Sequence, residues 1–103
     1  MIEKLLVAEL PDNRRIIGVV RLIIDPDGKS GEYAVLVGDQ WQGFGLGLKF
    51  MGSLIEIAKD KHLEKIYGYV MANNYKMLKL CNGLEFKAEK IDDETLMVSL
   101  DVC

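Results

Sequence analysis

The sequence predicts a single α/β domain of the α+β kind, in which a mixed, mainly antiparallel sheet is flanked by two main helices. Its 103 residues, 50% of them hydrophobic, suit one small globular core. Three strand-like runs separated by turn signals come first, and two segments of helical periodicity follow, each with strand-like residues after it. No repeat, linker or low-complexity segment interrupts this order, so we expect residues 1–103 to form one domain.

The first third of the chain has the pattern of an antiparallel meander. Leu5 to Leu10 is a short apolar run, and the turn signal Pro11-Asp12-Asn13-Arg14 separates it from the Ile- and Val-rich run from Arg15 to Ile24. A second turn cluster at residues 25–29 precedes Glu32 to Val37, which we expect to be a third, largely buried strand.

The middle of the chain predicts a helix and then a strand. Apolar residues recur at intervals of three and four from Gly47 to about Lys61, which is the period of a helix with one buried face. The apolar, β-rich run from Ile66 to Met71 lies between two helices, so we expect it to be parallel to the strand before the first helix. The apolar face of this helix comprises Gly47, Phe50, Met51, Leu54, Ile55 and Ala58.

The last third predicts a second helix and two strands. Asn73 or Asn74 has the residue type of a helix N-cap, and Asn82-Gly83 has that of a helix end. Residues 86–88 and 95–102 are expected to form the final strands, joined by a turn at residues 92–94. The buried stripe of the helix is predicted to be Met77, Leu78, Leu80, Cys81 and Leu84.

The charge of the chain limits the classes of partner that it is expected to bind. With 13 Lys and Arg against 16 Asp and Glu, the net charge is −3, and no basic run offers an electrostatic footprint for nucleic acid. The N-terminus lacks the apolar core and cleavage site of a signal peptide, and no uncharged run is long enough to cross a bilayer. We therefore expect a cytoplasmic protein without a membrane partner, which binds a small molecule or another protein.

Few residues suggest metal or redox chemistry. The two cysteines, Cys81 and Cys103, are expected to be free thiols, since a chain of this kind has no disulfide framework. No cluster of metal-ligand residues is present in the sequence, so no metal cofactor is expected. His62 lies in the charged stretch 59–62 and is expected to be a solvated residue at a helix end.

A glycine-rich stretch from Gly38 to Leu48 joins the third strand to the first helix. Glycines at 43, 45 and 47 let backbone N–H groups converge on a ligand, and the helix dipole adds positive potential, so an anion site is predicted there. The spacing fits neither a dinucleotide-binding fingerprint nor a P-loop, because Leu48 and Lys49 follow the last glycine. A glycine-rich hairpin or a flexible lid is the alternative.

The stretch Gln42-Gly43-Phe44-Gly45-Leu46-Gly47, together with the downstream Asn74, Met77, Leu80 and Phe86, resembles the GNAT superfamily of acyl-CoA-dependent N-acetyltransferases. The family's loop has the form Gln/Arg-x-x-Gly-x-Gly/Ala, which these residues satisfy in the same order of elements. The segments Gly31 to Val37 and Trp41-Gln42-Gly43 look closest to the acetyltransferase domain of bacterial protein lysine acetyltransferases.

The resemblance implies acetyl-CoA as cosubstrate and assigns residues to it. Backbone N–H groups from Gln42 to Gly47 would hold the pyrophosphate, and the strand before them would line the pantetheine arm on a side that splays from its neighbour. Asn74 would hydrogen-bond the cofactor from the other side of that splay. The complete set of implied cofactor-binding residues is Val35, Leu36, Val37, Gln42, Gly43, Phe44, Gly45, Leu46, Gly47, Asn74 and Met77.

The resemblance also implies Glu32 as general base for transfer to a primary amine, in particular a protein lysine. A lysine amine is mostly protonated at pH 7, and presenting it as a free nucleophile costs roughly 3.4 pK units, or about 4.6 kcal/mol. A carboxylate partly desolvated beside an apolar strand can accept that proton, and such a base is worth about 10²- to 10⁴-fold in rate. The alternative is that Glu32 is a strand-end carboxylate facing solvent.

The chain departs from the family at Cys81, where many members carry a tyrosine that protonates the departing thiolate. A thiol is a weak donor, but a thiolate with a pKa near 8.5 is already a good leaving group. The simpler interpretation is that Cys81 is a small buried residue on the apolar stripe.

Family members usually begin with a strand and two helices that help to build the acceptor side, and this chain starts at what would be the second strand. We therefore expect a domain truncated at its N-terminus, which belongs to a larger enzyme or is completed as a homodimer. The alternative function is a non-catalytic acyl-CoA-binding regulatory module.

Overall fold

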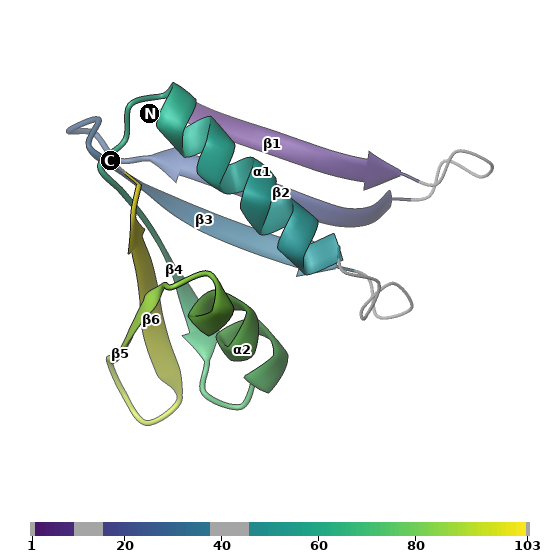
Figure 1. Cartoon of the computed structure of the whole chain (residues 1–103), viewed down its shortest axis with the longest axis vertical. Coiled ribbons are helices and arrows are strands. Elements are labelled where there is room, and N and C mark those ends of the chain that lie inside the picture. The colour runs from purple at the N-terminus through teal and green to yellow at the C-terminus, as the bar shows by residue number, and fades with distance from the viewer. Residues whose placement is uncertain (1, 10–15, 38–45, 103) are drawn as a thin grey trace.

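The computed structural model describes residues 2–9, 16–37 and 46–102, which form six strands and two helices (Figure 1). In chain order these elements are β1 (Ile2–Glu9), β2 (Ile16–Ile24), β3 (Ser30–Val37), α1 (Leu46–Asp60), β4 (Lys65–Met71), α2 (Tyr75–Gly83), β5 (Lys87–Lys90) and β6 (Thr95–Asp101). The predicted order of elements is confirmed.

The strands form one sheet in the order β1-β2-β3-β4-β6-β5. All neighbouring strands are antiparallel except β3 and β4, which are parallel. The sheet is therefore mixed and mainly antiparallel, as predicted, and β4 is parallel to the strand that precedes α1. Figure 1 shows β4 and β6 turning away from the direction of β1, β2 and β3.

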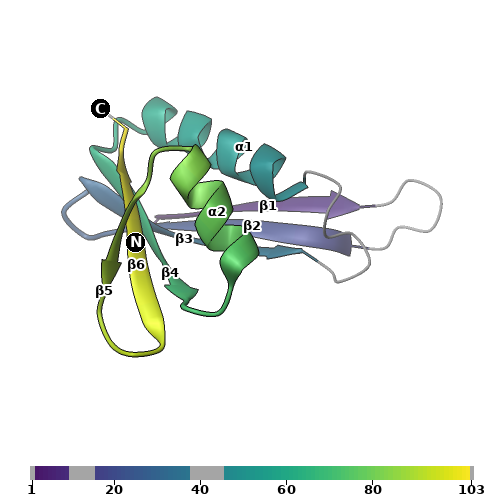
Figure 2. The ribbon, with the colours of Figure 1, turned by 60° about the horizontal axis from the view of Figure 1, so that its bottom comes forward.

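Both helices lie on the same side of the sheet (Figure 2), and the core fills the space between them and the strands. Because side chains alternate along a strand, every second residue of β2 and β4 points to this core. Gly47 brings the two helices together, since a Cβ there would lie 3.3 Å from Cδ2 of Leu80. Among the side chains that the structure describes, the buried hydrophobic residues are Val20, Leu22, Ile24, Tyr33, Phe50, Met51, Leu54, Ala58, Leu63, Ile66, Val70, Cys81, Phe86 and Val98.

Each helix ends or begins at a residue with a defined capping role. After α1, His62 has a left-handed backbone (φ 60°), and the N–H of Leu63 bonds back to the carbonyl of Ala58 at 3.0 Å. His62 is exposed, as expected for a residue at a helix end. Asn74 is the N-cap of α2, and its Oδ1 accepts a hydrogen bond of 3.2 Å from the N–H of Met77.

Some predicted strand boundaries and the predicted burial of the α2 stripe are wrong. β1 begins at Ile2 rather than Leu5, because an edge strand is held by backbone pairing, here Glu3 with Ile23 and Lys4 with Leu22, whatever its side chains. β5 runs from Lys87 to Lys90 and is exposed throughout, so no apolar pattern marks it. The stripe of α2 is less buried than predicted, because Cys81 alone among its residues is fully buried.

Candidate functional site

The ladder between β3 and β4 is short, and a cavity opens where it ends. The strands pair at Ser30 with Lys65, Gly31 with Ile66 and Glu32 with Tyr67, and then diverge. Each strand continues to pair on its other side, β3 with β2 as far as Val37 and β4 with β6 as far as Met71. The edges that β3 and β4 turn toward each other beyond Glu32 and Tyr67 therefore face the cavity, where their N–H and C=O groups can bind a ligand.

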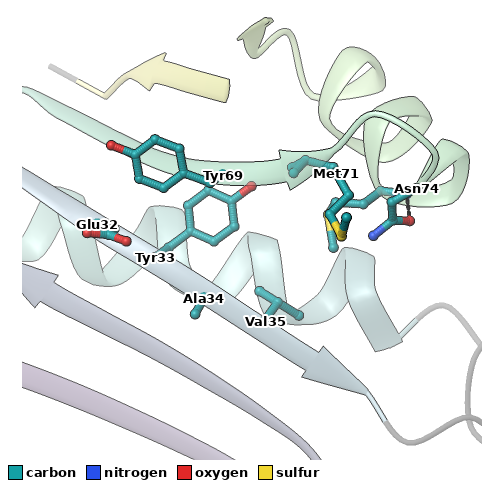
Figure 3. Close-up of a pocket in the computed structure, with 9 residues that line it drawn as sticks. Glu32, Tyr33, Ala34, Val35, Tyr69, Met71 and Asn74 are labelled. Atoms are coloured by element: carbon teal, nitrogen blue, oxygen red, sulfur yellow. Dashed lines mark hydrogen bonds between the residues drawn. The ribbon is translucent and has the colours of Figure 1, made fainter. Parts of the chain in front are cut away.

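The cavity has a volume of about 290 Å³, and both polar and apolar groups form its wall. Figure 3 shows Glu32 at one end and Asn74 at the other, with Ala34 and Val35 on β3 between them and Tyr69 and Met71 on the opposite strand. The residues that line the cavity are Glu32, Tyr33, Ala34, Val35, Tyr69, Val70, Met71, Asn74 and Met77. A space with a mixed wall and with polar side chains at both ends suits a flexible ligand that carries both apolar and amide groups.

Four of the residues predicted from the sequence lie on this cavity: Glu32, Val35, Asn74 and Met77. The Oδ1 of Asn74 is used by the helix cap, so its amide nitrogen is the group that can donate to a ligand. Leu36 and Val37 lie on β3 and Leu46 and Gly47 begin α1, next to α2. The predicted Gln42, Gly43, Phe44 and Gly45 lie outside the described residues.

Glu32 is exposed and lies beside Tyr67 at the last pair of the β3–β4 ladder. The hydroxyl of Tyr67 donates to the carboxylate of Asp25, at 3.0 Å from Oδ1 and 3.2 Å from Oδ2. Burial, this hydrogen bond and the negative charges of Asp25 and Glu32 raise the pKa of Tyr67 to about 12. The ring of Tyr69 packs edge-on against that of Tyr67, with ring centroids 6.2 Å apart. The Glu32 end of the cavity therefore combines two carboxylates, Asp25 and Glu32, with two aromatic rings.

Tyr33 is one of five cavity residues that were not among the predicted site residues; the others are Ala34, Tyr69, Val70 and Met71. Tyr33 is 6% exposed, its ring meets Phe86 edge-on at 6.1 Å, and its hydroxyl lies 3.5 Å from Sγ of Cys81. Burial and this hydrogen bond raise the pKa of the Tyr33 hydroxyl. The available signal was its position, two residues from both Gly31 and Val35, on the inward face of β3.

Cys81 has the environment of the simpler interpretation, a small buried residue, with 2% of its surface exposed. Burial raises the pKa of its thiol, and the hydrogen bond with Tyr33 partly opposes that shift. Cys81 lies behind Tyr33 rather than among the residues that line the cavity.

Within residues 2–9, 16–37 and 46–102, no three His, Cys, Asp or Glu side chains are grouped so that they could hold a metal ion. No helix in the described part of the chain is long and apolar enough to span a membrane.

These features define the chain as a mixed α/β ligand-binding domain whose cavity opens between two parallel strands. Comparison with known proteins names the family: the model of the acetyltransferase (GNAT) family matches residues 3–86, and the chain belongs to that family.

Individual proteins are similar to this chain in sequence or in fold. An acetyltransferase of Pseudomonas aeruginosa is 30% identical over 84 residues, which are 82% of this chain and 45% of that protein. The structure of an N-acetyltransferase from Staphylococcus aureus is 22% identical with a TM-score of 0.83, covering 98% of this chain and 68% of that one. The Campylobacter jejuni N-acetyltransferase PseH, solved in complex with acetyl coenzyme A, is 26% identical with a TM-score of 0.70, covering 87% of this chain and 62% of that one. The chain thus spans less than half the length of the Pseudomonas aeruginosa relative.

Proposed function

We propose that this protein is an N-acetyltransferase that moves the acetyl group of acetyl-CoA to a primary amine, in particular the side chain of a protein lysine. The observation that carries the proposal is the cavity between β3 and β4, with Glu32 at one end and Asn74 at the other. The pantetheine arm of acetyl-CoA is slender, flexible and amide-containing, which suits such a space. Family membership and the acetyl coenzyme A bound by the Campylobacter jejuni enzyme support the same cosubstrate.

The donor's phosphate groups belong, in this proposal, at the Asn74 end. The first turn of α1 lies against α2 there, because Gly47 packs on Leu80, and a helix N-terminus attracts anions. Backbone N–H groups from Gln42 to Gly47 would bind the pyrophosphate, and the amide nitrogen of Asn74 would donate to the cofactor from α2.

The acceptor amine belongs at the Glu32 end, where the thioester carbonyl would lie. Glu32 would take the proton of the amine as it attacks, and the exposed ring of Tyr69 beside it offers an aromatic surface to the aliphatic part of a lysine. Holding amine and thioester together in one cavity can supply roughly 7 to 11 kcal/mol of the barrier reduction. Acetyl-CoA supplies the activated acyl group and a thiolate leaving group.

A second function, a non-catalytic acetyl-CoA-binding regulatory module, is favoured by one observation. The helix position where the family resemblance implies a tyrosine that protonates the thiolate is occupied by Cys81, which is buried behind Tyr33. Such a module would bind acetyl-CoA in the same cavity without transfer.

Release of the CoA thiol from acetyl-CoA tests these functions. The reaction is followed with no amine, with a lysine-containing peptide, with the same peptide acetylated on its lysine, and with a diamine. An N-acetyltransferase for lysine gives release with the free peptide and none with the acetylated one. Binding of acetyl-CoA without amine-dependent release would favour the regulatory module, and absence of binding would refute both functions.

A further inference from the structure

We infer that Tyr33, packed against Gly68, is the positioning residue that sets the separation of β3 and β4 and thereby the shape of the cavity. The inference deepens the proposed function, because it concerns the cavity assigned above to acetyl-CoA. In this inference, Tyr33 and Gly68 act on the site by setting the distance between β3 and β4.

The contact lies where the ladder stops. Glu32 with Tyr67 is the last pair between β3 and β4, so Tyr33 and Gly68 are the next two residues in register. They face each other without forming a pair, and the ring of Tyr33 occupies the space into which a side chain at position 68 would point. A Cβ built on Gly68 would lie 2.5 Å from Cε1, 2.7 Å from Cζ and 2.9 Å from Cδ1 of that ring.

Neighbouring strands in a ladder lie roughly 4.8 Å apart, and the side chains of one strand stand beside those of the next. At this position the side chain of β3 instead reaches across to the backbone of β4, and Figure 3 shows the ring of Tyr33 in the space between the two strands. Tyr33 itself lines the cavity at this point, and the cavity continues along Ala34 on β3 and Tyr69 on β4.

The ring is held in this position from two further sides. Phe86 packs edge-on against the ring of Tyr33, with ring centroids 6.1 Å apart and planes at 69°. The hydroxyl of Tyr33 lies 3.5 Å from Sγ of Cys81 on α2. With 6% of Tyr33 exposed, the ring has little room to move aside and let the strands close. Because Gly68 has no side chain, the ring of Tyr33 fits over the backbone of β4. The tyrosine at position 33 therefore requires a glycine at position 68.

The test compares the dissociation constant for acetyl-CoA among the wild type and three purified variants, measured well below their melting temperatures. Tyr33→Leu removes the ring and is expected to raise the constant by roughly tenfold or more. Tyr33→Phe restores the ring without the hydroxyl and is expected to recover most of that loss. Phe86→Leu is the matched control, since Phe86 touches the same ring and is not among the residues that line the cavity, so it is expected to lower stability and change the constant by less than about twofold.

Hydrogen exchange gives a second measurement that does not depend on the ligand. If Tyr33→Leu lets the strands close, the amides at the facing edges near Ala34 and Tyr69 gain protection as new ladder hydrogen bonds form, and Phe86→Leu produces no such gain. This measurement reports on the strands even if the wild-type protein does not bind acetyl-CoA, an outcome that would refute the proposed function and leave the role of Tyr33 to be decided by exchange.

Gly68→Ala approaches the contact from the other strand and covers the case in which Tyr33→Leu does not fold. The added methyl group requires the ring to shift, so acetyl-CoA binding is expected to weaken, and in Tyr33→Leu/Gly68→Ala the loss of stability is expected to be smaller than the sum of the two single losses. The inference is overturned if Tyr33→Leu binds acetyl-CoA like Phe86→Leu and gains no protection, or, where Tyr33→Leu does not fold, if Gly68→Ala binds like the wild type.

Discussion

Glu32 and Tyr67 form the last pair of the parallel ladder between β3 and β4, and the two strands separate immediately after them. Because of this pairing, the Glu32 carboxylate lies at the end of the cavity, and its charge acts on the hydroxyl of Tyr67. The proposed base and the start of the cavity are therefore fixed by the same backbone contact.

Replacing the carboxylate of Glu32 tests its role as base. Glu32→Gln keeps the shape of the side chain and removes its capacity to accept the proton of the amine, so we expect transfer to slow by about 10²- to 10⁴-fold. Acetyl-CoA binding is expected to stay nearly intact. Initial rates of CoA release measure the effect, and Glu56→Gln, an exposed glutamate on α1, serves as control. If Glu32→Gln turned over like Glu56→Gln, Glu32 would be a solvent-facing strand residue with no catalytic role.

The hydrogen bond from Tyr67 to Asp25 is testable by alkaline titration. In the folded protein the pKa of Tyr67 is raised to about 12, above the ordinary value of about 10 that applies to the unfolded chain. The resulting contribution to stability is fully present below about pH 10 and is lost as the pH rises through 12. We expect Asp25→Asn to move the pKa of Tyr67 back toward 10, because the mutation removes a negative charge beside the hydroxyl.

Tyrosinate absorbance measures this shift, with Tyr67→Phe subtracted to isolate the signal of Tyr67 from the other three tyrosines. A Tyr67 pKa that is the same in Asp25→Asn as in the wild type would show that Asp25 does not control this hydroxyl.

Asn74 has two separable roles, since its Oδ1 caps α2 and its amide nitrogen is assigned to the cofactor. Asn74→Ala removes both and is expected to lower stability by about 1 kcal/mol and to weaken acetyl-CoA binding. Asn74→Ser keeps a capping oxygen, so it is expected to retain the melting temperature and still lose affinity. Thermal unfolding and calorimetric titration together make the comparison. Wild-type affinity in Asn74→Ser would limit Asn74 to the helix cap.

His62 follows α1 and has a left-handed backbone, a conformation that costs a residue with a Cβ about 1 kcal/mol. We expect His62→Gly to raise the melting temperature by roughly 4–8 °C, because glycine adopts this conformation without strain. His62→Ala keeps the Cβ and is expected to give no gain. Equal melting temperatures for the two variants would show that the backbone at position 62 stores no strain. Since His62 is exposed at a helix end, neither variant is expected to alter transfer.

The local parts of this fold and site could be predicted from the sequence because their causes are local. Asn74 has a capping side chain directly before an apolar stripe, and residues 92–94 form a turn in which the N–H of Glu94 donates to Oδ1 of Asp92 at 2.8 Å. The parallel pairing of β3 and β4 follows from the helix between them.

The parts that could not be predicted depend on contacts between distant segments. Neither Tyr33 nor Gly68 is unusual in its own strand, and the consequence of their meeting exists only after β3, β4 and α2 are assembled. The strand Lys87–Lys90 was only partly predicted, because its place at the edge of the sheet leaves it exposed, without alternation to mark it.

The most direct test of the account is an acetyl-CoA titration followed by the backbone amide resonances of the whole chain. Besides the amides of Gln42 to Gly47 that are assigned to the pyrophosphate, the account predicts large shifts on the two diverging strands and the start of α2, at Ala34, Val35, Met71, Asn74 and Met77. Shifts confined to other parts of the chain, or no shifts at saturating acetyl-CoA, would contradict the assignment of this cavity to the cosubstrate.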